Sequence, residues 1–177
     1  MKRIKLQTIT ILYQKGFTFI ELLLYLAIVT IMMTALIPFA WNTIEAGVKN
    51  STEQEVFSNA RYISEQLNYQ IRNASGINSV SATSISLATF NANTNPTVID
   101  LSAGNIRMKQ GTGAVINLNS ANTTISSLTF TNYTSADNKT KNIQYVFTIA
   151  ASFPSAGQRQ EYNESVTIES SAELRSN

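Results

Sequence analysis

The chain has 177 residues, of which 44% are hydrophobic and only 14% are charged, about half the charged share of an average soluble protein. It contains neither cysteine nor histidine, which excludes disulfides, thiolate zinc sites, cysteine nucleophiles and any chemistry that depends on an imidazole. A chain of this length accommodates one domain with an appendage, so a multidomain enzyme is not expected.

Positive charge is concentrated at the amino terminus. The first sixteen residues hold four cations and no acid, whereas the rest of the chain has nine basic and eleven acidic residues. The net charge of +2 and the pI of about 8.9 therefore come from this leader segment. A basic surface for nucleic acid is not indicated.

An uncharged segment follows at residues 22–44. As a helix it would be about 34 Å long, which exceeds the roughly 30 Å of hydrocarbon in a bilayer. Cations lie only before it, so we expect a single-pass protein of the inner membrane with its amino terminus in the cytoplasm and the region after Trp41 exported. A secretory signal cut after Ala40 is the alternative, but such signals usually have a shorter apolar region.

Glu21 is a carboxylate at the start of this apolar segment, where an ionised acid is costly unless a positive charge lies nearby. Gly16 offers an unhindered peptide bond, and cleavage after it would create a new amine on Phe17. Phe17 and Glu21 lie four positions apart and would share one helix face. We expect the amine of one subunit to neutralise Glu21 of a neighbour and so fix the register. The alternative places Glu21 at the level of the lipid headgroups.

These residues resemble a known superfamily, the type IV pilins and type II secretion pseudopilins. The resemblance covers residues 15–38 and rests on the string Gly16-Phe17-Thr18-Phe19-Ile20-Glu21-Leu22-Leu23, the apolar helix and Pro38. It implies that a prepilin peptidase cuts after Gly16 and methylates Phe17, and that Glu21 aligns incoming subunits. Two departures are a long leader and the absence of the carboxy-terminal cysteine pair of many pilins.

The resemblance also implies a set of partners. Membrane lipid would hold the subunit before assembly, and an inner-membrane assembly platform would then move it into an extracytoplasmic filament with other pilin or pseudopilin subunits. Nothing in the sequence points to nucleic acid as a partner. Weaker likeness at residues 61–76 and 172–175 favours a minor subunit over a major one.

A second helical segment is predicted after Pro38. Proline inside a helix predicts a kink there, with a simple helix end as the alternative. Helical spacing then resumes and predicts an amphipathic helix that ends near Asn73, with Ser75-Gly76 as the stop. A membrane helix and a separate soluble helix joined at residues 41–46 remain the alternative. The predicted buried stripe is Val56, Ala60, Ile63, Leu67, Ile71 and Ala74.

The last 102 residues have the composition of strands and loops, because 41 of them are Ser, Thr or Asn. Alternating apolar residues at 143–153 and shorter runs before and after predict six or seven strands in an antiparallel meander. The expected fold class is α+β and pilin-like, with a long helical stalk packed on a β-sheet head. The expected segments are a leader at 1–16, a transmembrane or filament-core helix at 17–41, an amphipathic helix at 42–75 and the head at 76–177.

Catalytic and cofactor motifs are not found in the sequence, so an enzyme is not expected. Asp100, Asp137 and Glu164 lie near Asn-rich loops and are candidate calcium ligands, although solvated surface acids are the preferred interpretation. The leading hypothesis is a structural subunit of a type IV pilus, a type II secretion pseudopilus or a competence-type filament. The other is a single-pass anchored envelope protein whose β head binds a ligand or a surface.

Overall fold

The computed structural model describes residues 16–137, 139–153 and 162–175. Contacts divide the chain into two units that meet between Thr43 and Ile44. The first unit consists of the apolar part of helix α1. The second contains the rest of α1 and all of the described strands. Residues 1–15 of the expected leader (1–16) lie outside the described residues, and so does Ala156-Gly157, where the sequence predicts a turn.

Helix α1 (Phe19–Arg72) has 54 residues and includes Pro38. The alternative of two separate helices is therefore wrong, and the helix ends one residue before the predicted end. Proline has no N–H, so α1 lacks one hydrogen bond at this turn, and the predicted kink at Pro38 stays a prediction. In the second unit, the predicted stripe of α1 is confirmed, because Val56, Ala60, Ile63, Leu67, Ile71 and Ala74 are all at most 1% exposed.

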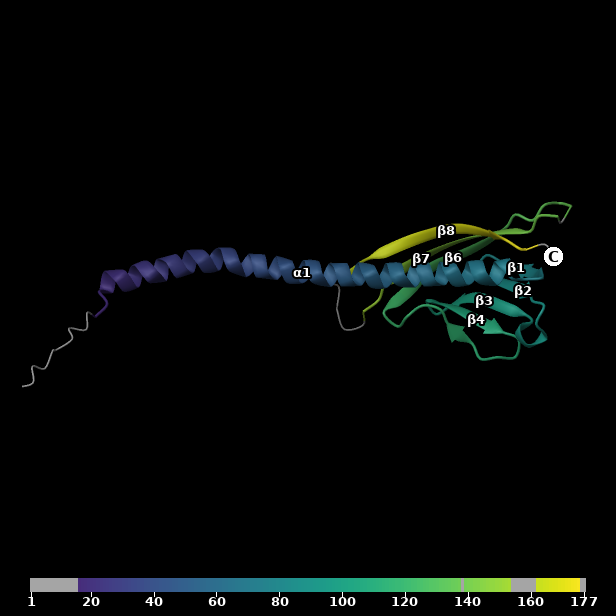
Figure 1. Ribbon diagram of the computed structural model, residues 1–177, viewed down its shortest axis with the longest axis horizontal. Helices are drawn as coiled ribbons and strands as arrows, with labels where there is room; N and C mark the ends of the chain where they lie inside the picture. The colour runs from purple at the N-terminus through teal and green to yellow at the C-terminus, as the bar shows by residue number, and fades with distance from the viewer. Residues whose placement is uncertain (1–15, 138, 154–161, 176–177) are drawn as a thin grey trace, which may run out of the picture. The chain divides into compact units, whose positions relative to one another are not determined.

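The strands form two antiparallel sheets (Figure 1). The first sheet has the order β1-β2-β3-β4-β5 and the second has the order β6-β7-β8. The bounds are β1 (Gly76–Val80), β2 (Ser84–Ala88), β3 (Thr97–Ser102), β4 (Asn105–Gln110), β5 (Ile116–Asn117), β6 (Thr123–Asn132), β7 (Asn142–Ala151) and β8 (Ser165–Glu173), with a short 3-10 helix η1 (Ala92–Thr94) before β3. The expected pilin-like α+β arrangement and the antiparallel pairing are confirmed.

The predicted number of strands is wrong, because the described residues contain eight. The missing strand is β1, which begins only four residues after α1 ends. Its register shifts between Ile77 and Ser79, and this bulge interrupts the alternation of apolar and polar residues from which strands are predicted. The division into two sheets was also not foreseen.

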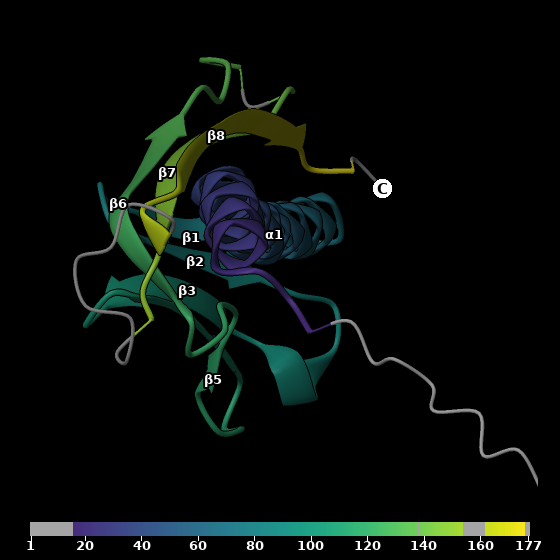
Figure 2. The ribbon, with the colours of Figure 1, turned by 90° about the vertical axis from the view of Figure 1, so that its left-hand side faces the viewer.

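Both sheets and α1 share a single core. The two sheets curve around the helix (Figure 2), and each contributes the apolar face of its strands to one buried cluster. Tyr145 and Phe147 of β7 are its largest fully buried side chains. The buried hydroxyl of Tyr145 lies 2.8 Å from the hydroxyl of Ser64 and donates to the Ser64 carbonyl at 3.1 Å. The head therefore uses α1 as part of its interior.

Turns of the first sheet cover the free edge of β6. The N–H of Phe130 donates to the carbonyl of Ala82 at 2.9 Å, and the N–H of Ile125 donates to that of Gly104 at 2.9 Å. Gly104 follows Ala103 in the turn between β3 and β4, and both residues have the positive φ of a two-residue hairpin turn. These contacts give hydrogen-bond partners to backbone N–H groups at the edge of β6, and they join the two sheets.

Asn119 is a buried polar side chain between β5 and β6. Its Oδ1 accepts the N–H of Ile106 at 3.1 Å, and its Nδ2 donates to the carbonyl of Thr123 at 2.9 Å. The next residue, Ser120, bonds to α1 through Asn59 Oδ1 at 2.9 Å and Glu55 Oε1 at 2.7 Å. This short segment therefore links β4, β6 and the helix.

Replacement of Asn119 by Ala should destabilise the head by about 1–3 kcal/mol, because the buried N–H of Ile106 loses its acceptor. The control is Asn117→Ala, an exposed position whose replacement should change the free energy of unfolding by less than about 0.5 kcal/mol. Pulse proteolysis of the full chain over a urea series measures both. Equal midpoints for the two variants would contradict the assigned role of Asn119.

Candidate functional site

The bond between Gly16 and Phe17 lies just before the helix. Gly16, Phe17 and Thr18 are outside α1, which begins at Phe19. Phe17 is 76% exposed, and a side chain added at Gly16 would meet no atom within 4 Å. A protease needs an accessible bond in a backbone that is not held in a helix, and this bond meets both conditions.

Thr18 forms the N-cap of α1. Its hydroxyl oxygen accepts the N–H of Glu21 at 3.3 Å, and its carbonyl accepts the N–H of Leu22 at 3.2 Å. Thr18 and Glu21 have the spacing of a capping box, in which a hydroxyl residue precedes an acid by three positions. Sequence reasoning missed this role of Thr18, although the spacing is visible in the sequence. The cap begins the helix directly after Phe17.

Glu21 lies in the first turn of α1, where the helix dipole favours a negative charge. Its Oε1 accepts a hydrogen bond from the Tyr25 hydroxyl at 3.2 Å. The rings of Phe17 and Tyr25 meet edge to face, with centroids 6.1 Å apart. Phe17 and Glu21 therefore both contact Tyr25, although Phe17 itself precedes the helix. Tyr25 was not predicted to take part, although its position four residues after Glu21 is a usable signal.

The helix after Glu21 is apolar and exposed in the first unit. It contains a window with a mean hydropathy of 2.4, none of which is buried, and it is long and apolar enough to cross a membrane. Its exposed side chains include Leu26, Ile31, Ile37, Phe39 and Trp41, each at least 57% exposed. Such a surface is stable in lipid or against other apolar helices, so it fits a membrane-anchored protein.

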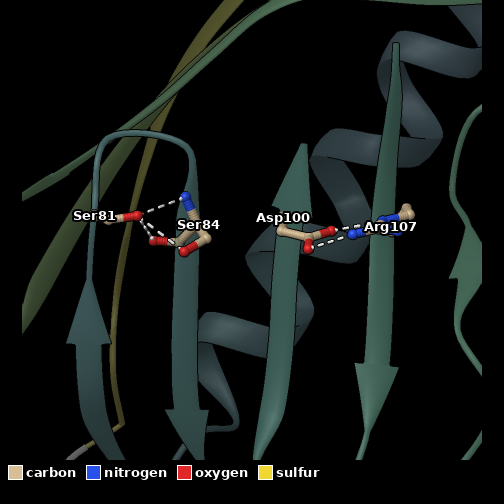
Figure 3. A network of polar contacts seen from close by, with 4 residues as sticks. All are labelled: Ser81, Ser84, Asp100 and Arg107. Carbon is tan, nitrogen blue, oxygen red and sulfur yellow. Dashed lines mark hydrogen bonds and ion pairs between the residues drawn. The ribbon is translucent and has the colours of Figure 1, made fainter. Parts of the chain in front are cut away.

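The candidate calcium ligands are not brought together. Asp100 of β3 forms a two-pronged ion pair with Arg107 of β4, at 2.9 and 2.7 Å (Figure 3). Asp137 accepts hydrogen bonds from the Ser135 hydroxyl and the Lys139 N–H, which lower its pKa. Glu164 precedes β8. Among residues 16–137, 139–153 and 162–175, no group of three or more acidic, His or Cys residues is placed to hold a metal.

Comparison with known proteins identifies the amino-terminal segment. Residues 11–37 match the family model of the prokaryotic N-terminal methylation motif. The match contains Gly16, Phe17, Glu21 and the exposed apolar helix, and it supports a prepilin-type subunit of the pilin or pseudopilin kind. It includes neither Pro38 nor the head. No curated protein and no solved structure matches the chain.

Removal of the Thr18 hydroxyl should loosen the first turn of α1. We expect Thr18→Val to cost about 0.5–2 kcal/mol of helix stability, which speeds amide hydrogen exchange at Glu21 and Leu22 by roughly 2- to 30-fold. Hydrogen exchange of the full chain in bicelles measures this. Thr30→Val is the control, because the Thr30 hydroxyl bonds within the helix to the Leu26 carbonyl. An unchanged rate at Glu21 would contradict the cap.

Proposed function

We propose that this chain is a structural subunit of a type IV pilus, a type II secretion pseudopilus or a competence-type filament. A prepilin peptidase cuts it after Gly16. The observation that carries the proposal is the placement of Phe17 and Glu21, which both contact Tyr25, directly before an exposed helical segment without charge (residues 22–44), inside the segment that matches the methylation motif.

Before processing, the chain is an inner-membrane protein with its leader in the cytoplasm. The four cations of the leader oppose transfer across the membrane, whereas residues 22–44 carry no charge that would prevent insertion. The head, whose buried positions on α1 begin at Thr52, is exported. Lipid covers the apolar surface of α1 at this stage.

Cleavage changes the charge at the start of the helix. Hydrolysis of the bond between Gly16 and Phe17 removes four cations with the leader and leaves one new amine on Phe17. An α-amine has a pKa of about 7.7–8.0 and is mostly protonated at neutral pH. A methyl group on this nitrogen leaves it basic, so the processed chain keeps a cation directly before the cap residue Thr18.

The new amine gives Glu21 a partner on a neighbouring subunit. In an apolar bundle a lone carboxylate is costly, and pairing with an ammonium removes much of that cost only when the two groups meet closely. In the unassembled chain the Tyr25 hydroxyl holds the carboxylate. A subunit that enters out of register leaves Glu21 without its partner, so this pair selects the correct axial position.

Two details of the proposal need their own measurements: which filament system uses the subunit, and whether it is a minor subunit. The minor-subunit hypothesis rests on the likeness of residues 61–76 and 172–175 to minor pilins and stays a prediction. The number of copies in each isolated filament, measured by quantitative mass spectrometry, tests it. Purification of the assembly machinery that binds the chain identifies the system.

The amino terminus of the native protein tests the proposal directly. Mass spectrometry should find a chain that begins with N-methylated Phe17, because the peptidase removes the first sixteen residues. A chain that starts at residue 1 or 2 would support the anchored envelope protein instead. A start at Trp41 would support a cleaved secretory signal.

Replacement of Glu21 separates processing from assembly. Glu21→Ala should leave cleavage and methylation intact but lower the amount in sheared filaments by tenfold or more, since loss of one partner of a desolvated pair costs about 3–5 kcal/mol. Immunoblots of membrane and sheared fractions measure both steps. Tyr25→Phe is the control, because it removes only the hydroxyl bond to Glu21 and should assemble. Normal assembly of Glu21→Ala would contradict the pairing.

A further inference from the structure

A recess lies at the edge of the first sheet that β5 forms. Its volume is about 400 Å³, within the usual range of small-molecule sites. Met108 of β4 and Ile116 of β5 belong to its lining, and they are paired across the two strands, so their side chains share one face of the sheet. Met108 is only 6% exposed, whereas Ile116 is 47% exposed. The recess therefore has an apolar floor that a ligand can reach.

Two loops form the walls of this recess. One is the turn of η1 with Asn93 and Thr94, and the other is the segment 112–114 between β4 and β5. The loops approach each other at Gly111, where φ is +53° and an added Cβ atom would collide with the carbonyl oxygen of Asn93. Glycine permits both the backbone conformation and the close approach. The N–H of Gly111 donates to the carbonyl of Pro96 at 2.9 Å, so the loop after β4 is held next to the η1 turn.

Three backbone N–H groups of the walls already have acceptors within the chain. Those of Asn93 and Thr94 donate to the side chain and the carbonyl of Asn91, each at 3.0 Å. That of Gly113 donates to the carbonyl of Gln110 at 2.8 Å. Loops bind anions through free N–H groups or through cationic side chains. All residues that line the recess belong to the described part of the chain and none is charged, so the recess does not suit an anion.

Three polar side chains of the lining can still bond to a ligand. The amide of Asn93 and the hydroxyl of Thr112 form no hydrogen bond with the described residues, and both positions are exposed. Gln110 donates through Nε2 to Oε1 of Gln70 at 3.4 Å, which leaves its own Oε1 as an acceptor. An amide and a hydroxyl each donate and accept hydrogen bonds. The lining therefore offers donors and acceptors that suit an uncharged polar ligand.

We propose that this recess binds a neutral pyranose sugar. The C–H groups on one face of a pyranose ring are apolar, and this face lies on Met108 and Ile116. The hydroxyl groups around the ring bond to the side chains of Asn93, Gln110 and Thr112. An extended peptide fits less well, because such a peptide is held mainly by backbone hydrogen bonds, and three N–H groups of the walls are already occupied.

The inference goes beyond the proposed function, because binding of a sugar by the head requires neither cleavage after Gly16 nor assembly. The site would be present both in a filament subunit and in an anchored envelope protein. Its test can therefore use the purified full chain, whatever the state of its amino terminus.

Methyl NMR of the full chain in bicelles tests the site. The chain has four methionines, and of these only Met108 lies after residue 44, so ¹³C-methyl methionine gives one signal from the head. The probes are the methyl glycosides of glucose, galactose, mannose and N-acetylglucosamine. At least one should shift the Met108 signal with saturation and a Kd on the order of 1 mM, as expected for about a dozen non-hydrogen atoms. The signals of Met32 and Met33 should not change.

Variants at exposed positions separate the polar contacts from the space of the recess. Asn93→Ala with Thr112→Val should weaken binding by about 5- to 150-fold, the effect of two hydrogen bonds. Ala114→Trp should fill the recess and abolish the shift. The matched control is Asn122→Ala, an exposed asparagine in the turn before β6, which should leave binding unchanged. The Met108 signal of each variant without sugar shows whether the head is folded.

Two further probes define the ligand. Methyl glucuronide should bind more weakly than methyl glucoside, because no cation lines the recess. A tetrasaccharide of the sugar that binds distinguishes its source: tighter binding than the methyl glycoside indicates a unit of a polysaccharide, and weaker binding indicates a free sugar. Either result supports the sugar site.

Three outcomes overturn the inference. In a folded chain, none of the four glycosides shifts the Met108 signal, or the shift grows without saturation, or it persists in Ala114→Trp. A saturable shift with an uncharged tetrapeptide and none with the glycosides would assign the recess to a peptide instead. None of these results concerns processing, so the proposed function stands or falls separately on the native amino terminus.

Discussion

The structure of the amino-terminal unit depends on one charge in an apolar setting. Glu21 is the only residue with a charged side chain from Gly16 to Ile44, and lipid or an apolar bundle penalises such a charge by about 2.5 kcal/mol or more near the bilayer centre. The Tyr25 hydroxyl and the dipole of α1 moderate this cost in the single chain. In the filament we propose, the amine of a neighbouring subunit would moderate it further, and the need to satisfy one carboxylate would then link processing of the leader to assembly.

The head depends on α1 in a different way. In the part of the chain that the structure describes, neither sheet has a second layer of its own, and the apolar faces of both pack against the stripe from Val56 to Ile71. The polar connection through Asn119 and Ser120 then fixes the two sheets relative to the helix. The same helix is therefore an exposed apolar surface in one unit and an interior layer in the other.

The sequence predicts most of this arrangement because the spacing of apolar residues follows the side of each helix or strand that is buried. The spacing of Val56, Ala60 and Ile63 and the alternation from Ile143 to Ile149 both correspond to buried positions in the structure. Strand β1 is not predicted because its bulge interrupts the alternation of apolar and polar residues. The division into two sheets is not predicted because it depends on hydrogen bonds between segments that are distant in the sequence. In the site, the roles of Gly16, Phe17 and Glu21 are predictions from residue type, spacing and the resemblance to pilins. The contacts of Thr18 and Tyr25 with Glu21 were not predicted, although both spacings are present in the sequence.

The absence of a break in α1 has a mechanical consequence. No loop separates the apolar segment from the buried stripe, so tension applied to the amino-terminal half reaches the core of the head without first extending a linker. Pulling a helix along its own axis against two flanking sheets loads many side-chain contacts at once in shear. A head built in this way resists stretching better than one whose strands would separate one after another.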